Sequence, residues 1–375
     1  MANVAKLLYS TVEECFLDNL EPDASPLKAA RTKIRDHLRN EFAARSREVF
    51  GRVVTPKFFT QGSCAYKTLN DPAWPPQQQK DMDDGCYLPL SFVRGARPSQ
   101  AAQLFFDFVD AALQDLAAQE GWTHVDDKDT CVRLEISSDS HVDVPLYAIP
   151  DAEFARLRDS AIAAQMEVTK RAKPDTWEAL PSDAVLLAHR KEDWIESDPR
   201  KIHAWFIDAV DLFKERLRRD CRYMKAWRDH HGLDRYKVTS ILLMACVYNA
   251  YELIRGPFLS DREDERFLQV VERIPKMLRG PVANPSEPGE DLNRIPEKYR
   301  ETVAKAAEQL ANQMRQVVKH CANEQEAVDA MIDLLGERVP DRADLVSVAA
   351  AAVATVAATP KRQVEAPTVG RSSSG

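Results

Sequence analysis

The chain has 375 residues, of which 44% are hydrophobic and 29% are charged, and its formal net charge is −8. This is the composition of a globular protein with a sizeable buried core, and it excludes a disordered or fibrous chain. The acidic balance also disfavours long nucleic acid as a ligand, because proteins that coat a duplex need an excess of basic side chains.

The first 150 residues change from a helical pattern to strand patterns. Ser25 and Pro26 indicate the cap and first turn of a helix, and apolar residues at three- and four-residue spacing continue it to Gly51. The expected strands span 57–61, 81–93, 130–136 and 141–148, and a further helix spans 101–119. These elements predict a mixed sheet flanked by helices.

The second half of the chain has helical patterns throughout. Residues 173–199 are polar and interrupted by prolines, which predicts a linker that crosses to this half. The expected helices span 199–229, 239–253, 261–278, 297–321 and 324–336. We therefore predict a core lobe with N-terminal helices over residues 1–190, a helical lobe that closes a cleft over 191–345, and an alanine-rich segment with a flexible tail over 346–375.

The cysteine and hydropathy patterns favour a cytoplasmic protein without a membrane partner. The seven cysteines are widely spaced and form no C-x-x-C pair, which favours free thiols and disfavours a disulfide framework or a structural zinc site. The N-terminus lacks the layout of a signal peptide. The apolar run at 345–358 is too short and too rich in alanine to span a bilayer.

Three aspartates are the first candidates for chemistry. Asp81 and Asp83 stand at positions i and i+2 of a predicted strand, so their side chains share one face, roughly 6.6 Å apart along the strand. Asp143 alternates with two valines on a later strand, and a metal shared with the acidic pair would explain its position. Oxygen ligands suit magnesium, and two such ions stabilise the attacking and leaving oxygens of a displacement at phosphorus. The alternative for DMDDG is an acidic surface turn.

Two further features suit a bound phosphate. Gly62 and Ser63 follow the strand at 57–61, where a glycine lets the backbone approach an anion, although an ordinary strand-to-helix turn is the alternative. A basic helix face opposite the acidic site would suit a triphosphate, and a solvated helix surface is the alternative. Its residues are Arg218, Arg222, Lys225 and Asp229.

Several stretches together resemble the CD-NTase family, the bacterial relatives of cyclic GMP-AMP synthase, and within it the DncV-like synthases. They read FFTQGSCAYKTLN, MDDGCYLP, TCVRLEI with HVDVPLYAIP, WIESDP and CRYMKAWRD. The likeness covers the chain from Pro56 to Ala250, with a weaker match in the helices beyond. It implies an α+β fold: a polymerase-β-type nucleotidyltransferase core, built as a mixed sheet with helices, plus a helical lobe.

The resemblance also implies roles for the residues at matching positions. Asp81, Asp83 and Asp143 would bind two Mg²⁺ ions, with Mn²⁺ as an alternative, and Asp143 would help to deprotonate the attacking ribose hydroxyl. The residues that would contact nucleotides and their phosphates are Gln61, Gly62, Ser63, Tyr66, Arg133, Ser197, Lys225 and Ser240. The register of the hairpin, which the sequence leaves open, decides whether Arg133 shares a face with Asp143. The loop ANPSEPGEDLN departs from the family's spacing, so it receives no nucleotide contact.

The same resemblance implies that ATP and GTP are joined into a cyclic GMP-AMP, which would signal phage infection to a downstream effector. The base preference and the phosphodiester linkage stay open. One rival is a linear oligonucleotide synthase or RNA-end nucleotidyltransferase, which a basic track into the cleft would favour. The other rival is an inactive nucleotide-binding scaffold, which the loss of a metal-binding aspartate would favour.

The last residues, TVGRSSSG, are small and polar and end in Gly375. A flexible glycine end can enter a narrow active site. Some members of the resembling family are joined to other proteins through such a glycine, by a partner that looks like a fused ubiquitin-activating and ubiquitin-conjugating (E1–E2-type) enzyme. Conjugation through Gly375 is therefore a hypothesis, and a plain flexible tail is the alternative.

Overall fold

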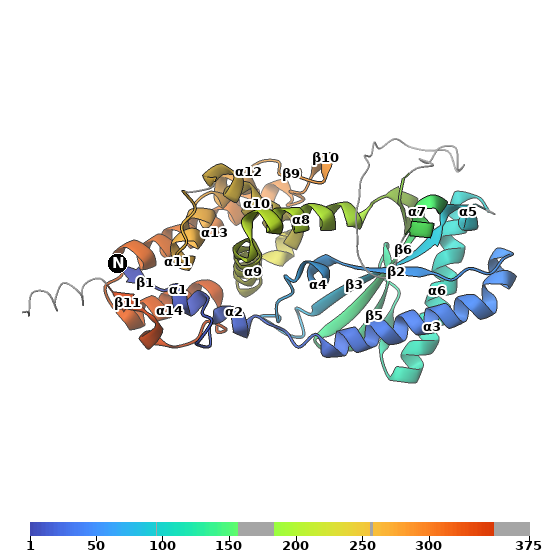
Figure 1. The fold of residues 1–375 in the computed structure, drawn as a ribbon, viewed down its shortest axis with the longest axis horizontal. Helices are drawn as coiled ribbons and strands as arrows, with labels where there is room; N and C mark the ends of the chain where they lie inside the picture. The colour runs from blue at the N-terminus through green and yellow to red at the C-terminus, as the bar shows by residue number, and fades with distance from the viewer. Residues whose placement is uncertain (95, 157–183, 256–257, 349–375) are drawn as a thin grey trace, which may run out of the picture.

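Two lobes lie side by side along the longest axis of the molecule (Figure 1). The computed structural model describes residues 1–94, 96–156, 184–255 and 258–348. One lobe contains the main sheet with its covering helices, and the other is almost wholly helical. The expected tail at 359–375 and Gly375 lie outside the described residues.

A seven-stranded mixed sheet forms the first lobe. Its order is β2-β3-β6-β5-β4, with β7 paired to β6 and β8 paired to β7. β3 and β6 are parallel, whereas the other pairs are antiparallel. The strands are β2 (Lys57–Gln61), β3 (Lys80–Pro89), β4 (Thr123–Val125), β5 (Cys131–Ser137), β6 (Ser140–Ile149), β7 (Leu186–His189) and β8 (Asp193–Glu196). The strand at 57–61 and the hairpin of β5 and β6 agree with the sequence-based prediction.

Two long helices cover one face of this sheet. α3 (Ser25–Phe50) and α6 (Pro98–Glu120) pack on each other and on the even-numbered residues of β3 and β6. Ala24 is the cap of α3 and Ser25 its first residue, so the expectation that Ser25 caps the helix is wrong. α3 ends as predicted at Gly51, whose φ of 77° is left-handed. The odd-numbered face of the sheet is left for the second lobe and the site.

The second lobe is built from helices around one apolar core. They are α8 (Pro199–Phe213), α9 (Glu215–His230), α10 (Ser240–Ile254), α11 (Glu263–Val271), α12 (Ile274–Arg279), α13 (Glu297–Arg315) and α14 (Glu324–Leu335), with short helices η2 (Leu233–Tyr236), η4 (Gln316–His320) and η5 (Ala343–Leu345) and the small hairpin of β9 (Ala283–Asn284) and β10 (Glu287–Asp291). Remaining short helices of the chain are α1 (Ala5–Leu8), α2 (Phe16–Asn19), α4 (Gly62–Tyr66), α5 (Leu90–Val93) and α7 (Asp151–Arg156). Among the described residues, no helix has the length and apolarity needed to cross a membrane.

The N-terminal residues pack into the helical lobe. β1 (Ala2–Asn3) pairs with β11 (Ser347–Val348), and buried residues of α1 and α2 belong to the same apolar core as α9 and α10. A pairing across more than 340 residues leaves no local signal in the sequence, which explains why β1 was not expected. The proposed domain boundaries at 190 and 345 stay predictions.

Other expectations need correction. The segment 173–199 is more than a linker, because its described part forms the β7–β8 hairpin on the sheet. The helix expected at 199–229 breaks at Lys214, which has a φ of 65°, and the helix at 261–278 is divided into α11 and α12. The apolar spacing continues through these breaks, so periodicity alone does not reveal them.

Candidate nucleotidyl-transfer site

A row of polar residues crosses four neighbouring strands on the odd-numbered face of the sheet. Asp83 of β3 lies opposite Asp143 of β6 in their parallel register. On either side of them, Gln61 of β2 lies opposite Asp83, and Arg133 of β5 lies opposite Asp143. Because side chains alternate along a strand, this row points away from the core that Met82 enters from the other face.

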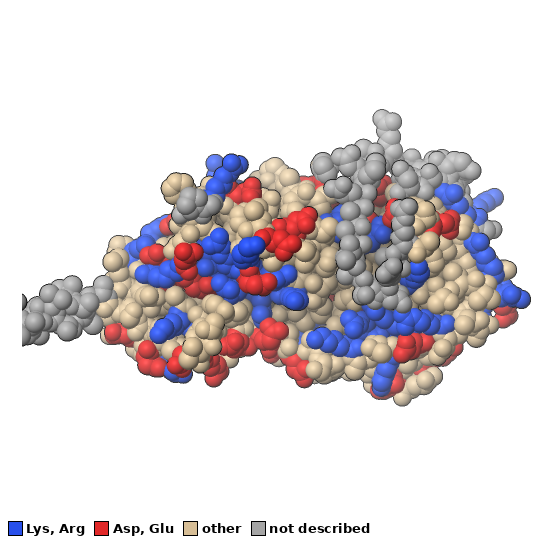
Figure 2. All heavy atoms as spheres, in the orientation of Figure 1, with Lys and Arg blue, Asp and Glu red and all other residues tan. Residues whose placement is uncertain are grey.

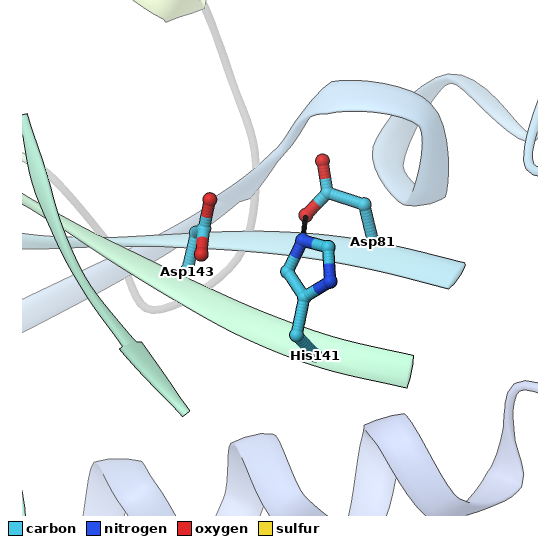
Figure 3. Close-up of side chains that lie close together, drawn as sticks. All are labelled: Asp81, His141 and Asp143. Atoms are coloured by element: carbon cyan, nitrogen blue, oxygen red, sulfur yellow. Dashed lines mark ion pairs between the residues drawn. The ribbon is translucent and has the colours of Figure 1, made fainter. Parts of the chain in front are cut away.

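Asp81 and His141 form the next pair on the same face. They lie opposite each other in the register of β3 and β6, and Asp81 Oδ1 is 3.1 Å from His141 Nε2. One ligand atom each of Asp81, His141 and Asp143 lies within 4.8 Å of the others, and Figure 3 shows the three side chains on one side of the two strands. Asp81 Oδ1 and His141 Nε2 are buried and have no hydrogen-bond partner. These donor atoms fit a divalent cation.

The expected ligand Asp83 stands next to this group and packs against Gly62. A Cβ built on Gly62 would lie 2.1 Å from Asp83 Oδ2, and Gly62 has a φ of 66°, so both space and backbone conformation require glycine there. Burial raises the pKa of Asp83 well above its usual range, and the charges of Asp81 and Asp143 raise it further. A cation bound beside the three carboxylates would offset that repulsion.

Arg133 shares the face of Asp143 and forms a two-pronged ion pair with it. Arg133 Nε donates to Asp143 Oδ1 at 2.6 Å, and Nη2 donates to Oδ2 at 2.7 Å. The antiparallel register of β5 and β6 thereby answers the question that the sequence left open. In this structure the guanidinium binds a carboxylate. Carboxylates and phosphates can both accept two parallel hydrogen bonds from one arginine.

A cavity of about 410 Å³ lies between the sheet edge and the helical lobe. Five of the sequence-predicted residues line it: Ser63, Asp81, Arg133, Lys225 and Ser240. The wall on the side of the helical lobe comes from α9, η2 and the start of α10. Its size is that of a small-molecule site, and it lies between the lobes as expected.

The basic face of α9 mainly binds the loop that follows α4. Arg218 Nε donates to the backbone oxygen of Tyr66 at 2.9 Å, and Arg222 Nε donates to Asn70 Oδ1 at 2.9 Å. Lys225 Nζ donates to the backbone oxygen of Thr68 and also lines the cavity. Burial lowers the pKa of Lys225 to about 8, and the nearby charge of Arg228 contributes. Of this face, only Lys225 is therefore in position to meet a phosphate.

Gln61 and Ser240 each have a fixed hydrogen bond. Gln61 Nε2 donates to Tyr147 Oη at 3.1 Å, while Gln61 Oε1 is buried without a partner. Ser240 is the first residue of α10, and its Oγ accepts from Arg228 Nη1 at 2.9 Å. Arg228 also lines the cavity, so this pair places both a hydroxyl and a guanidinium at the wall.

Tyr66 and Ser197 are less directly placed. The ring of Tyr66 is buried with its centroid 5.5 Å from that of Phe206, in the core of the helical lobe. Ser197 follows β8 and donates its N–H to the backbone oxygen of Val185 at 3.1 Å. Neither residue is among those that line the cavity in the described part of the chain. Their nucleotide contacts stay predictions.

Charges of both signs lie on the surface of both lobes. On the face drawn in Figure 2, Lys and Arg side chains lie in local groups interleaved with Asp and Glu, in both lobes.

Two family models match this chain. Residues 56–147 match the cyclic GMP-AMP synthase DncV-like nucleotidyltransferase domain, and residues 214–348 match the C-terminal domain of cyclic GMP-AMP synthase. The chain belongs to the DncV-like nucleotidyltransferase family. The first model contains the aspartates of β3 and β6, and the second contains the cavity wall from α9 to α10.

Curated relatives and solved structures agree with this family. The chain is 37% identical over 215 residues to a cyclic GMP-AMP synthase of Vibrio cholerae, an alignment that covers 54% of this chain and 48% of that protein. A cyclic GMP-AMP synthase of Escherichia coli is 37% identical over 206 residues, which cover 52% of this chain and 47% of that protein. The chain thus spans about half the length of the curated relatives that it matches.

The overall structure is similar to that of the Vibrio cholerae di-nucleotide cyclase DncV. One solved structure of that protein matches with a TM-score of 0.73 and 26% identity, over 93% of this chain and 99% of the other. Another, in complex with a linear intermediate, matches with a TM-score of 0.72 and 25% identity over the same shares. These matches confirm the predicted α+β nucleotidyltransferase fold with a helical lobe.

His141 and Arg228 line the cavity but were not among the sequence-predicted site residues. A signal for His141 was present, because it stands two residues before Asp143 and must share its face of the strand. Arg228 follows Lys225 by three residues on the same helix, so helical spacing also placed it near the cavity. Gln79, which contacts His141, lies in an irregular loop where no pattern predicts a side-chain position.

Proposed function

We propose that the chain is a nucleotidyltransferase that makes a cyclic GMP-AMP from ATP and GTP with Mg²⁺ as its cation. The observation that carries the proposal is the placement of Asp81, Asp83 and Asp143 on one face of two adjacent strands, beside a cavity with hydroxyl and basic walls. Membership of a family whose matched relatives are named cyclic GMP-AMP synthases supports the substrates and the product.

Three residues have chemical roles in this proposal. Asp143 accepts the proton of the attacking ribose hydroxyl. Arg133 exchanges Asp143 for an oxygen of the triphosphate as substrate enters, because the guanidinium can pair with either in the same two-pronged way. Lys225, charged at neutral pH, holds a phosphate at the opposite wall. A bound divalent cation would supply charge stabilisation of the attacking and leaving oxygens.

The reaction consists of two displacement steps of the same kind. In the first, a ribose hydroxyl of one nucleotide attacks the α-phosphorus of the other and forms a phosphodiester bond. The bond from the α-phosphorus to the oxygen that bridges to the β-phosphate breaks, and pyrophosphate leaves. In the second, the free ribose hydroxyl of the linear intermediate attacks its own remaining α-phosphorus, and a second pyrophosphate leaves. The cavity must therefore hold both nucleotides, and the choice of hydroxyl in each round sets the linkage.

Incubation with all four nucleoside triphosphates and Mg²⁺, followed by mass spectrometry, tests the proposal. The expected result is the mass of a cyclic GMP-AMP, absent when EDTA replaces Mg²⁺. A ladder of linear products would favour the linear synthase or RNA-end transferase. Nucleotide binding without any product would favour the inactive scaffold.

We further propose a role in antiphage signalling in the cytoplasm, with a downstream effector that binds the cyclic product. Conjugation of Gly375 to a lysine of another protein belongs to the same proposal and lies outside the described residues. Co-expression with an E1–E2-type enzyme encoded nearby should give higher-mass adducts on denaturing gels. Adducts that persist after deletion of Gly375, or that never form, would leave this segment as a plain tail.

A further inference from the structure

A contact between Asp81 and His141 is not explained by the three-aspartate site. His141 Nδ1 lies 2.8 Å from Gln79 Oε1, and Gln79 Nε2 donates to the backbone oxygen of Ser138 at 3.3 Å. Because the amide nitrogen of Gln79 donates to Ser138, the amide oxygen is the atom that faces the His141 ring. An oxygen can only accept, so Nδ1 carries the proton that it donates.

This tautomer leaves the other ring nitrogen, in a neutral imidazole, with a bare lone pair. That nitrogen, His141 Nε2, faces Asp81 Oδ1 at 3.1 Å, which is an ion-pair distance for a protonated ring, and neither buried atom makes a hydrogen bond in the described residues. The side chain of His141 is only 8% exposed, so bulk water does not satisfy it. Two acceptor atoms held this close need a positive charge between or beside them.

We propose that His141 binds a divalent cation through Nε2, together with carboxylate oxygens of Asp81 and Asp143, and that Gln79 holds the ring in the required tautomer. The ligand atoms already lie within 4.8 Å of one another, while bonds of about 2.1 Å place opposite ligands of one ion about 4.2 Å apart. A histidine ligand that donates its second N–H to an oxygen is the usual arrangement in metal sites. The role of the cation rests on the proposed function, but its binding does not.

A nitrogen ligand changes which cation the site prefers. Mg²⁺ favours oxygen ligands and water, whereas imidazole is a common ligand of first-row transition metals. The site should therefore bind Mn²⁺ more tightly than Mg²⁺ in the absence of nucleotide. Removal of the imidazole should narrow that difference, because the ligands that remain are carboxylates.

Pulsed electron paramagnetic resonance of the full chain loaded with Mn²⁺ alone tests the proposal. Wild type should show coupling of Mn²⁺ to ¹⁴N, and the pattern should change when histidine is labelled with ¹⁵N. His141→Asn keeps an N–H that can donate to Gln79 but removes Nε2. This variant should lose the nitrogen coupling and bind Mn²⁺ about tenfold or more weakly. His203→Asn is the matched control, since His203 is half-buried against Tyr66, outside this group.

The outcomes separate this proposal from the proposed function. Bound Mn²⁺ without nitrogen coupling would overturn it and make His141 a protonated partner of Asp81. Absence of Mn²⁺ binding at millimolar concentration would overturn it as well. Nitrogen coupling in a chain that forms no product would refute the synthase activity and leave the metal ligand standing.

Discussion

One cluster of buried charge in the described residues lies on the sheet face, and another lies in the helical lobe. In the helical lobe, Arg266 is 1% exposed and contacts both Asp220 and Glu263. Asp220 also accepts from Tyr251 Oη at 2.6 Å, and Glu263 accepts two bonds from Arg219. Every carboxylate in this cluster thus has donors from neighbouring helices.

The cluster on the sheet face is different, because its acids gather without enough donors. Asp81 Oδ1 and His141 Nε2 are buried and have only each other at 3.1 Å, and Gln61 Oε1 is buried without a hydrogen-bond partner. Arg133 is the one guanidinium paired to Asp143 in the described residues. Buried polar atoms are normally satisfied, so an unsatisfied group in a cavity wall indicates a missing ligand. We infer that the helical-lobe cluster stabilises the fold, whereas the sheet-face cluster is the one proposed to bind substrate and cation.

The largest expected effect comes from the sheet cluster. Asp81→Asn combined with Asp83→Asn should reduce product formation at least about 10³-fold, or ~4 kcal/mol of transition-state stabilisation. The melting temperature should not fall. The folded-state pKa of Asp83 is raised, so its ionised form destabilises the fold at neutral pH, and an amide removes that effect. Product assays and thermal unfolding, with exposed Asp107→Asn as control, measure both. A lower melting temperature with unchanged turnover would show that Asp81 and Asp83 stabilise the fold and do not take part in the reaction.

The helical cluster should show the opposite behaviour. Arg266→Met leaves the charges of Asp220 and Glu263 without their shared partner, and we expect the free energy of unfolding to fall by about 3–5 kcal/mol. Product formation per folded molecule should hardly change. Arg315→Met, which breaks an exposed pair with Glu272, is the control. Denaturant unfolding measures the free energy of unfolding. An equal decrease in the two variants would show that Arg266 has no special structural role.

Gly62→Ala, compared with Gly51→Ala, should separate the effect of backbone strain on product formation from the effect of displacing Asp83. The new Cβ would collide with Asp83 Oδ2, and the left-handed backbone adds a strain of about 1–2 kcal/mol. We expect product formation to fall about 100-fold, of the order found when a catalytic group is misplaced by an ångström. Gly51→Ala carries the same backbone strain, with a φ of 77° and no atom within 4 Å. An equal loss of product formation in both variants would show that displacement of Asp83 does not cause the loss.

Lys225 should give the smallest effect, a dependence on pH. Its pKa of about 8 lies below the ordinary value of 10.5, so from pH 8 to 10.5 the unfolded chain binds more protons and the free energy of unfolding rises with pH. Nucleotide affinity should fall about tenfold between pH 7 and 9, because phosphate prefers the charged amine. Titration with a fluorescent ATP analogue measures the affinity. Lys225→Arg should flatten the profile, and a flat wild-type profile would exclude a phosphate contact.

Residue patterns predicted the parts of this molecule that depend on local order. The i and i+2 spacing of Asp81 and Asp83 predicted their common face, and Gly62 marked the turn after β2, although its close approach to Asp83 was not predicted. Both follow from strand geometry and from the space that a Cβ requires. The hairpin of β5 and β6 was equally local.

Features that depend on distant contacts were not predictable in this way. The pairing of β1 with β11 joins the two ends of the described chain, and the docking of β7 on β6 is set by the sheet edge available to it. The basic face of α9 was recognised, but whether its cations meet phosphate or the backbone of a loop depends on where that loop lies. The tautomer of His141 likewise depends on Gln79, 62 residues away.

In the proposed function two triphosphates react twice in one cavity, and the ratio of pyrophosphate to product tests this most directly. With ATP, GTP and Mg²⁺, we predict two pyrophosphates released for each dinucleotide, and a dinucleotide that alkaline phosphatase does not alter, because a closed ring has no terminal phosphate. One pyrophosphate for each phosphatase-sensitive dinucleotide would contradict the account, since the site would then stop at the linear product.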